Sequence, residues 1–453
     1  MGDDTASATV SRVSAGERLD RLPLSRWHRR MVLLIGLGSF FNFYEVALGS
    51  FFGVLLTPQW HLSPTQQALV VGVAFIGEMI GSLTLAPLAD RFGRRLLFQV
   101  NLISYAVLSL AGAFSPGLGV FLVLRVLTGI GLGAELTLVD TYLSEMLPAA
   151  KRGRCTAWSY TLGLLAVPVA GGLAKSATGT VFGIAGWRWL LGLAALGGVA
   201  VWLSRRRLPE SPRWLAATGR EAEAEAVVRQ IERAAGADPE RVIATPERKA
   251  PETTAATGKP GADSTRRRSL LLWAMWILGP IGFYGFASIA PIVLLAKGFD
   301  LQHSLMFSAL TAIGYPLGSL VSVHLCERVE RRNLLIGSTL AIGVFGTVFG
   351  SATSIGLILV AGTASTLSSV VQSNVSHIYQ AELFHSGKRS TSIALPYSAS
   401  RLVSALLPLV AVGLLARIGA GGMYAGCAAL LVALAVLVRF LGPRTNNRRL
   451  DTI

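Results

Sequence analysis

Five charged side chains lie inside long apolar stretches of the sequence: Glu45, Glu78, Arg125, Glu135 and Arg401. A charge at the centre of a bilayer costs about 3 kcal/mol or more, so each of them requires a specific purpose. A carboxylate beside an arginine stays ionised, and it takes up a proton when the arginine is drawn away. A guanidinium can also bind an organic carboxylate through two parallel hydrogen bonds. These residue types therefore indicate proton transfer and anion binding.

Glu45 and Arg125 are predicted to lie at a similar depth. Glu45 is about 21 Å from one end of its apolar stretch, and Arg125 is about 10 Å from the opposite surface of a core about 30 Å thick. We interpret them as a proton-coupling pair, in which Glu45 exchanges protons as Arg125 moves away. The alternative is a static buried ion pair that only fixes the packing of two helices.

Arg401 is the candidate anchor for an anionic substrate. It lies about 16 Å into its stretch, near the midplane, and no acidic residue shares that stretch. The alternative is that Arg401 pairs with Glu78, which lies about 17 Å into its own stretch, or with Glu135. Glu135 is in turn predicted to neutralise Arg125 or Arg401, or to contact a cationic group.

Aromatic and amide side chains in the same stretches are expected to line a substrate cavity, with helix packing as the alternative for each. His377 has two interpretations, a proton relay or a hydrogen-bonded histidine near the end of a helix. Glu135 and Arg401 complete the predicted substrate site. The aromatic and amide members are Asn42, Tyr44, Trp158, Phe283, Tyr284, Gln372, Asn374 and Tyr397.

Twelve apolar stretches in the sequence must position these side chains. About 20 apolar residues cross the hydrocarbon core of a bilayer, and only a helix satisfies its own backbone there within one segment. The chain is 52% hydrophobic and 15% charged, which is less charge than a soluble protein carries. We therefore predict an all-α membrane protein with twelve transmembrane helices. The stretches start near Met31, Gln67, Leu96, Leu118, Arg154, Ile184, Leu270, His303, Asn333, Ile355, Ser390 and Gly421.

The basic residues are distributed unevenly among the segments that connect these stretches. If the N-terminus is cytoplasmic, the inner loops and tails hold 35 of the 41 lysines and arginines. This asymmetry is typical of a multi-pass protein of the plasma (inner) membrane with both termini in the cytoplasm. The net charge of +16 does not indicate nucleic-acid binding, because the basic residues form no patch interleaved with aromatic residues.

The order of the stretches divides the chain into two pseudo-symmetric six-helix bundles. The segment between the bundles interrupts the apolar pattern, and within it residues 220–234 are predicted to form a charged surface helix. The first segment is polar and is expected to be mobile. The predicted segments are a cytoplasmic tail (1–30), the N-terminal bundle (31–203), a cytoplasmic linker (204–269), the C-terminal bundle (270–441) and a second cytoplasmic tail (442–453).

A repeat at one constant offset relates the two bundles. Residues 90–95, Asp-Arg-Phe-Gly-Arg-Arg, recur 237 residues later as 327–332, Glu-Arg-Val-Glu-Arg-Arg. A shared offset over several residues predicts two bundles of parallel topology, related by an axis along the membrane normal. Three further residues recur at the same offset: Tyr142, Glu145 and Arg152, as Tyr379, Glu382 and Arg389.

These residues resemble the major facilitator superfamily over nearly the whole chain. Residues 90–95 resemble its most specific loop signature. Residues 145–153 (Glu-x-x-Pro-x-x-x-Arg-Gly) and 209–215 (Pro-Glu-Ser-Pro-Arg-Trp-Leu) resemble its sugar-porter branch and the metabolite and organic-ion relatives of that branch. Residues 125–133 resemble the fourth-helix motif of that branch, and 399–401 resemble the eleventh helix of organic-anion and metabolite–proton transporters.

The resemblance implies how the charged side chains are arranged. Helices one and four lie side by side in this superfamily, so Glu45 and Arg125 are expected to pair. Helix eleven, which carries Arg401, is expected to face a central cavity between the bundles. The run Gly129-x-Gly131-x-Gly133 lies inside an apolar helix with no strand before it, so we interpret it as a helix-packing surface.

The charged loops at the cytoplasmic helix ends are expected to act as a gate. Ion pairs there would close the inner side of the protein in one state and break in another, which is the two-state element that alternating access requires. The alternative is that these basic loops only set the topology. The predicted gating residues are Asp90, Arg94, Arg95, Glu145 and Arg152, mirrored by Glu327, Arg331, Glu382 and Arg389.

Together these features favour a proton-coupled symporter of a small organic acid or related metabolite. The alternatives are a proton-coupled exporter, which Pro168-x-x-Gly171-Gly172 weakly suggests, and a non-transporting membrane receptor. We expect no enzyme activity, cofactor or metal site, because no nucleophile–base arrangement or metal-ligand spacing is present. The expected partners are a small-molecule substrate, protons and the lipid bilayer, with a monomer as the unit. The substrate is left open among sugars, aromatic acids, nicotinate-like acids and aliphatic acids.

Overall fold

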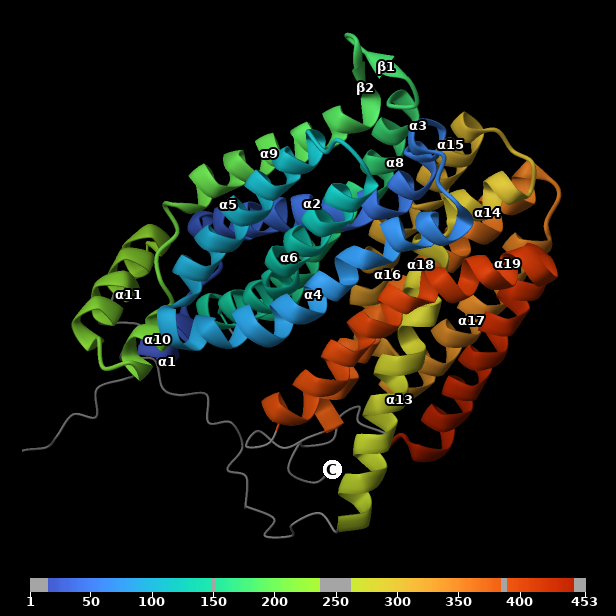
Figure 1. The fold of residues 1–453 in the computed structure, drawn as a ribbon. Helices are drawn as coiled ribbons and strands as arrows, with labels where there is room; N and C mark the ends of the chain where they lie inside the picture. The colour runs from blue at the N-terminus through green and yellow to red at the C-terminus, as the bar shows by residue number, and fades with distance from the viewer. Residues whose placement is uncertain (1–14, 149–150, 237–261, 384–388, 444–453) are drawn as a thin grey trace, which may run out of the picture.

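The computed structural model describes residues 15–148, 151–236, 262–383 and 389–443, and these are almost entirely helical (Figure 1). The elements are α1 Ala15–Arg21, α2 Arg26–Leu55, α3 Thr57–Trp60, α4 Pro64–Phe92, α5 Arg94–Ala113, α6 Leu118–Met146, α7 Arg152–Leu164, α8 Ala166–Ser176, β1 Thr180–Val181, β2 Ile184–Ala185, α9 Gly186–Arg205, α10 Pro212–Ala217, α11 Glu221–Ala235, α13 Ala262–Ala287, α14 Ala290–Ala296, α15 Leu301–Thr311, α16 Gly314–Arg328, α17 Arg331–Ser351, α18 Ile355–Leu383 and α19 Arg389–Leu441.

The helices account for the twelve predicted membrane crossings. Within the described residues, 11 helices are long and apolar enough to span a bilayer, and the last of them runs for 47 residues, Leu395–Leu441. That helix turns back at Gly419, whose φ of 69° only glycine adopts without strain. It therefore contains the eleventh and twelfth crossings. The fifth crossing is α7 with α8, and the eighth is α15 with α16.

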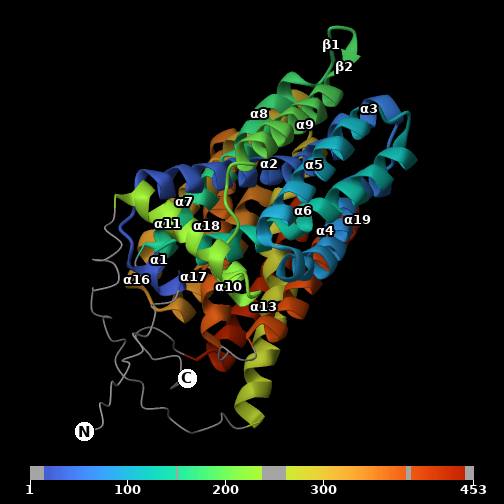
Figure 2. The same cartoon turned by 90° about the vertical axis from the view of Figure 1, so that its left-hand side faces the viewer.

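The internal repeat is visible in the helix boundaries. Helix α6 spans Leu118–Met146, and α18 spans Ile355–Leu383, so both ends of α18 follow those of α6 by the same 237 residues. The two halves form two bundles that lie side by side, coloured blue to green and yellow to red (Figures 1 and 2). The β1–β2 hairpin lies at one end of the bundles, which we call the hairpin end. The opposite end carries α1, α10, α11 and the start of α13, and we call it the basic end.

Glycines allow α4 and α6 to pack with their backbones in contact. A Cβ on Gly129 would lie 2.2 Å from the Ala74 carbonyl oxygen, and one on Gly133 would lie 2.1 Å from that of Glu78. Both distances are too short for a real side chain, which supports the packing interpretation of this glycine run. The repeat reproduces the contact in the C-terminal bundle, where a Cβ on Gly318 would lie 2.4 Å from the Leu367 carbonyl oxygen.

The basic end of the N-terminal bundle is covered by α1, α10 and α11. Residues 15–21 fall in the predicted mobile tail but form α1, whose Arg18 bonds Glu232 of α11 at 2.6 Å. The hydrogen bond to Glu232 raises the pKa of Arg18. Helix α11 lies where the charged surface helix is predicted. Helix α13 begins at Ala262, eight residues before the predicted start of the C-terminal bundle and inside the predicted linker, whose residues 237–261 lie outside the described residues.

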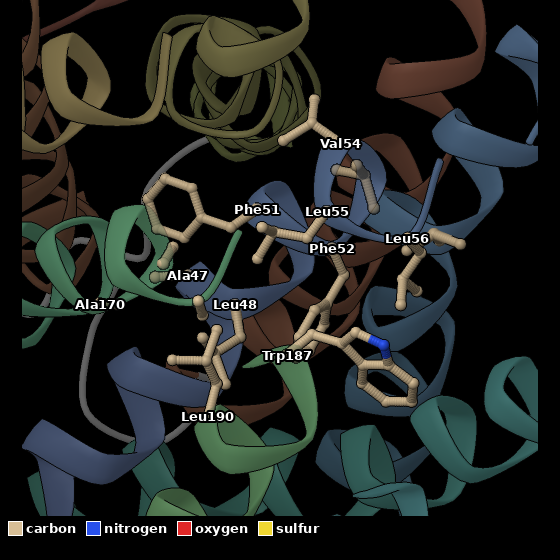
Figure 3. Close-up of a cluster of buried hydrophobic side chains, with 14 of the residues drawn as sticks. Ala47, Leu48, Phe51, Phe52, Val54, Leu55, Leu56, Ala170, Trp187 and Leu190 are labelled. Atoms are coloured by element: carbon tan, nitrogen blue, oxygen red, sulfur yellow. The ribbon is translucent and has the colours of Figure 1, made fainter. Parts of the chain in front are cut away.

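The two bundles are sealed together at the hairpin end by apolar side chains. One buried cluster joins Phe51 and Val54 of α2 to Ile292 of α14 and Leu305 of α15. Figure 3 shows the α2 side of this cluster, where Phe52 and Leu55 gather near Trp187 of α9. No comparable apolar cluster joins the bundles at the basic end within the described residues.

Candidate functional site

A cavity of about 910 Å³ lies between the two bundles and is the candidate substrate site. Arg401 lines it midway along the first part of α19. Arg152 and Arg331 also line it, and they are the first residues of α7 and α17 at the basic end. The cavity therefore extends from the middle of the bundles to the basic end, while the apolar cluster closes the hairpin end.

Arg401 is held at the cavity wall by three oxygen atoms. Its Nη1 donates to the Tyr284 hydroxyl at 2.6 Å, and its Nη2 donates to the Tyr397 hydroxyl at 2.7 Å. Its Nη1 also lies 3.1 Å from Oε2 of Glu78, which comes from α4 of the other bundle. Of the two predicted alternatives, the pairing with Glu78 is therefore present, and Arg401 nevertheless remains on the cavity wall with only 7% of its surface exposed.

Aromatic rings form the wall beside Arg401. The Tyr397 ring packs edge-on against Trp276, with centroids 4.8 Å apart. The His377 ring lies 5.1 Å from Trp276 and 5.9 Å from Tyr397. Its Nδ1 lies 3.3 Å from the Gln380 amide nitrogen, which fits the hydrogen-bonded histidine that was one of the two predictions. An aromatic wall with a fixed guanidinium at its edge suits a flat organic anion.

The two predicted amides of α18 lie on the cavity wall. Asn374 donates to the Ser322 hydroxyl at 2.6 Å, and Gln372 donates to the Thr339 hydroxyl at 3.4 Å. Each is anchored to the neighbouring helix by one donor and keeps its carbonyl oxygen for another partner. Phe283 and Tyr284 of α13 line the same cavity.

Four of the predicted lining residues lie elsewhere. Tyr44 is buried inside the N-terminal bundle, where its hydroxyl donates to the Leu190 carbonyl at 3.3 Å. Trp158 points outward with 49% of its surface exposed. Asn42 donates to the Leu132 carbonyl and borders a smaller adjacent cavity of about 50 Å³. The structure does not place these three on the main cavity. The sequence of α2 is mostly apolar and that of α7 has polar residues on more than one side, so neither sequence marks one inner face.

Glu135 is the fourth, and it pairs with neither Arg125 nor Arg401. It bonds Arg205, the last residue of α9, with 2.6 Å between Oε1 and Nη1. The Arg205 guanidinium also donates to the Leu34 and Ile35 carbonyls and lies over the Phe98 ring at 4.7 Å. Arg205 thus reaches back from the basic end into the bundle interior. The sequence does not indicate this inward position, because Arg205 stands in a run of arginines at the end of a helix. An arginine side chain is long enough to reach about one helix turn from its own backbone.

Glu45 and Arg125 form the expected pair inside the N-terminal bundle. Arg125 donates from Nη1 to Oε2 of Glu45 at 2.7 Å and from Nη2 to the Glu45 carbonyl at 3.0 Å. The Ser109 hydroxyl donates to Oε1, so both carboxylate oxygens are occupied. Glu45 is fully buried, and neither member of the pair lines the substrate cavity. Ser109 was missed, because a single serine in an apolar stretch gives no signal of its own.

The predicted gating residues of the N-terminal bundle form a network within that bundle. Arg94 bonds Glu145 at 3.0 Å and Asp90 at 2.9 Å. The backbone amides of Arg94 and Arg95, at the start of α5, both donate to the Glu210 carboxylate. Glu210 belongs to the Pro-Glu-Ser-Pro segment, and its negative charge lies where a helix N-terminus favours it.

Arg152 pairs with a residue outside the predicted gating set. It bonds Asp20 of α1 at 2.8 Å, and Asp20 also bonds Arg213 of α10 at 2.6 Å. Asp20 was missed because it lies in a segment that is polar throughout. In the C-terminal bundle Arg331 lines the cavity, while the side chains of Glu327, Glu382 and Arg389 lie outside the described residues. Within the described part of the chain, no group of three or more His, Cys, Asp and Glu side chains is placed to hold a metal ion.

The two bundles, the cavity between them and its buried charges define a multi-pass membrane transporter. The family of sugar (and other) transporters matches residues 30–453, so this chain belongs to that family, a branch of the major facilitator superfamily. The chain is 31% identical over 409 residues to the inner membrane metabolite transport protein YgcS of Escherichia coli, covering 87% of each chain.

Two further comparisons extend this assignment. The chain is 27% identical over 443 residues to the niacin transporter NiaP of Acinetobacter baylyi, covering 96% of this chain and 98% of that protein. Its fold is similar to the partially occluded inward-open conformation of the xylose transporter XylE from E. coli, with a TM-score of 0.76 and 17% identity over 94% of this chain and 100% of that one. The family is one of transporters and not of enzymes.

Proposed function

We propose that this chain is a proton-coupled symporter of small organic acids, most specifically of acids whose carboxylate is joined to an aromatic ring. It would act as a monomer in the inner membrane, with both termini in the cytoplasm. The basic end would then face the cytoplasm, in keeping with the excess of basic residues in the loops assigned to that side. The cavity would be open to the cytoplasm, with the hairpin end closed.

The geometry of Arg401 carries this proposal. Its guanidinium is oriented by the Tyr284 and Tyr397 hydroxyls and lies on the cavity wall beside the Trp276 ring. A substrate carboxylate would form two charge-assisted hydrogen bonds to Arg401, and its ring would stack against the aromatic wall. The niacin transporter among the relatives carries a molecule of this kind, an aromatic ring with one carboxylate.

Glu78 makes the binding of an anion conditional. In the structure Oε2 of Glu78, from the opposite bundle, lies 3.1 Å from Nη1 of Arg401 and forms an ion pair with it. An entering carboxylate would compete with Glu78 for the guanidinium and would loosen this link between α4 and α19. Substrate binding would in this way be coupled to the relative movement of the two bundles, which alternating access requires.

Glu45 and Arg125 would supply the proton coupling. Arg125 lies 2.7 Å from Glu45, and a helix movement that withdraws Arg125 would leave a buried, unpaired carboxylate, which takes up a proton. Because the pair lies away from the cavity, the substrate would act on it through helix movement and not by direct contact.

The proposal is tested with the purified full-length chain in liposomes. Niacin uptake is measured with an inward-directed pH gradient, without a gradient, and as counterflow exchange, with xylose as the neutral comparison. We expect gradient-driven accumulation of niacin, loss of that accumulation when the gradient is collapsed, and no uptake of xylose. Uptake of xylose in preference to niacin would contradict the anion assignment, and accumulation that ignores the gradient would contradict the coupling.

Export is the less favoured direction. The segment Pro168-x-x-Gly171-Gly172 prompted that alternative, but Gly171 has a packing role at the bundle interface. A Cβ on Gly171 would lie 2.7 Å from the Ala309 Cβ, so the glycine allows α8 and α15 to touch. A comparison of everted and right-side-out vesicles under the same gradient separates import from export.

A further inference from the structure

Three polar side chains follow one another along a buried face of α5. Asn101, Tyr105 and Ser109 are spaced by four residues, which places them on the same side of the helix. At most 2% of the surface of each is exposed. The row extends for about 12 Å along the helix axis. Neither the substrate cavity nor the pairing of Glu45 with Arg125 uses Asn101 or Tyr105.

The row runs between two buried ion pairs of the N-terminal bundle, Glu45 with Arg125 and Glu135 with Arg205. Ser109 donates to Glu45 at one end. Tyr105 is close enough to Glu45, Glu135 and Arg205 to interact electrostatically with all three. At the other end, the Phe98 ring lies under the Arg205 guanidinium one turn before Asn101.

Helix α6 follows the same course beside the row. A Cβ on Gly131 would lie 3.5 Å from both the Asn101 carbonyl oxygen and the Tyr105 Cβ. Arg125 and Glu135, on either side of Gly131, are about 15 Å apart along α6, similar to the length of the row. The charged groups that face the row are therefore Glu45 of α2, Arg125 and Glu135 of α6, and Arg205 of α9.

Several polar atoms along the row have no hydrogen-bond partner among the described residues. They are the Tyr105 hydroxyl, both side-chain amide atoms of Asn101, and Oε2 of Glu135. Buried polar groups are nearly always hydrogen-bonded, and internal water satisfies those that protein atoms do not reach. By contrast, the Tyr44 hydroxyl on α2 is also buried but donates to the Leu190 carbonyl.

We propose that Asn101, Tyr105 and Ser109, bridged by internal water, form the path along which protons move between Glu45 and the Glu135–Arg205 pair near the basic end. Each hydroxyl or water accepts a proton on its oxygen and releases its own to the next acceptor, so every group is neutral again after the transfer. The Asn101 amide does not gain or lose a proton itself, and it acts as a positioning residue that holds the water by hydrogen bonds. This inference rests on the proton coupling proposed above.

The path is separate from the route of the substrate. None of its three residues lines the cavity between the bundles. Arg205 is the last residue of α9, and it is close enough to Tyr142 to interact with it, as are Arg95 and Glu145 of the basic-end network. Protons would thus pass through the interior of one bundle, while the substrate passes between the two.

The test compares gradient-driven niacin uptake with niacin counterflow exchange in liposomes, for the full-length wild type and four variants. Tyr105→Phe removes only the hydroxyl, and Asn101→Leu removes the amide at similar volume. Asn101→Ser restores a small group that can hold water. Tyr44→Phe is the matched control, because it removes a buried hydroxyl that already has a protein partner.

We expect Tyr105→Phe and Asn101→Leu to slow gradient-driven uptake about tenfold or more, as loss of a positioned proton-transfer group does. Their counterflow exchange should stay near the wild-type rate, and Asn101→Ser and Tyr44→Phe should retain both activities. Unchanged driven uptake in the first two variants, an equal loss in Asn101→Ser, or a parallel fall in exchange would overturn the path. A wild type that exchanges niacin but ignores the gradient would instead refute the coupling itself, and the path with it.

Discussion

Arg401 of the C-terminal bundle and Glu78 of the N-terminal bundle lie 3.1 Å apart at the wall of the cavity. The pair joins α4 to α19 at the level where the substrate would bind, and both side chains are almost fully buried. Oε1 of Glu78 has no hydrogen-bond partner among the described residues, so the carboxylate is bound through one oxygen only. Such a pair is easier to exchange for a ligand than a bidentate one.

Replacing Arg401 with alanine should abolish binding of carboxylate substrates. The loss of a buried, hydrogen-bonded charge partner costs about 2–5 kcal/mol, which is roughly a 30-fold or larger increase in Kd for niacin. Thermal-shift titration of the purified protein measures the change. Because the single variant leaves Glu78 unpaired, the double variant Arg401→Ala/Glu78→Gln serves as the control for stability. Unchanged niacin affinity in the double variant would refute the role of Arg401 as the anion anchor.

Replacing Glu78 with glutamine should have the opposite effect on affinity. The amide keeps the shape of the side chain but no longer neutralises Arg401, so an entering carboxylate meets a stronger positive charge. We expect niacin to bind about tenfold more tightly, which corresponds to roughly 1.4 kcal/mol, close to the lower end of the range for a hydrogen bond to a charged group. Equal or weaker binding in the same titration would mean that Glu78 helps to form the site and does not compete for it.

Glu45→Gln should separate coupling from transport. The amide oxygen can still accept the hydrogen bond from Arg125, and the amide NH2 can donate to the Ser109 hydroxyl, so the helices remain packed. The variant cannot exchange a proton at this position. Gradient-driven accumulation of niacin should therefore be lost, while counterflow exchange continues at a rate near that of the wild type. Full accumulation by this variant would show that the pair is only structural.

Arg205→Ala should destabilise the N-terminal bundle strongly. It leaves Glu135 as an unpaired buried charge, which costs about 3–5 kcal/mol. The double variant Arg205→Met/Glu135→Leu removes both charges at similar volume and should recover most of that loss. Thermal unfolding of the purified proteins in detergent measures both. If the recovered double variant also lost gradient-driven uptake, the pair would have a role in proton transfer beyond holding the helices together.

Much of this fold could be predicted from the sequence, because the thickness of the bilayer sets the length of each apolar stretch and the repeat offset relates the two bundles. The pair of Glu45 and Arg125 was also accessible, since the two charges lie at the same depth in neighbouring helices. The side of α2 on which Tyr44 lies could not be predicted, because the membrane-spanning part of that helix is mostly apolar and shows no preferred face.

The reach of Arg205 was likewise hidden from the sequence. Its guanidinium occupies space that Gly38 leaves open, since a Cβ on Gly38 would lie 1.9 Å from Nη2. Gly38 of α2 thus leaves room for an arginine of α9, and no pattern within either helix indicates this contact. Contacts of this kind depend on which helices meet, and helix periodicity does not determine that.

The two ends of the interface between the bundles differ in the residues that form them, and they should therefore respond differently to salt. At the hairpin end the contact is apolar, from Phe51 and Val54 to Ile292 and Leu305, so its strength depends on temperature and hardly on dissolved ions. At the basic end the ion pairs among the described residues, such as Arg94 with Glu145 and Arg152 with Asp20, lie within the N-terminal bundle, and ions in solution screen charges over about 10 Å at 0.1 M salt. Ionic strength should therefore change the rate of the step that rearranges the basic end more than the rate of the step that opens the hairpin end, which makes salt a means of separating the two steps in a kinetic experiment.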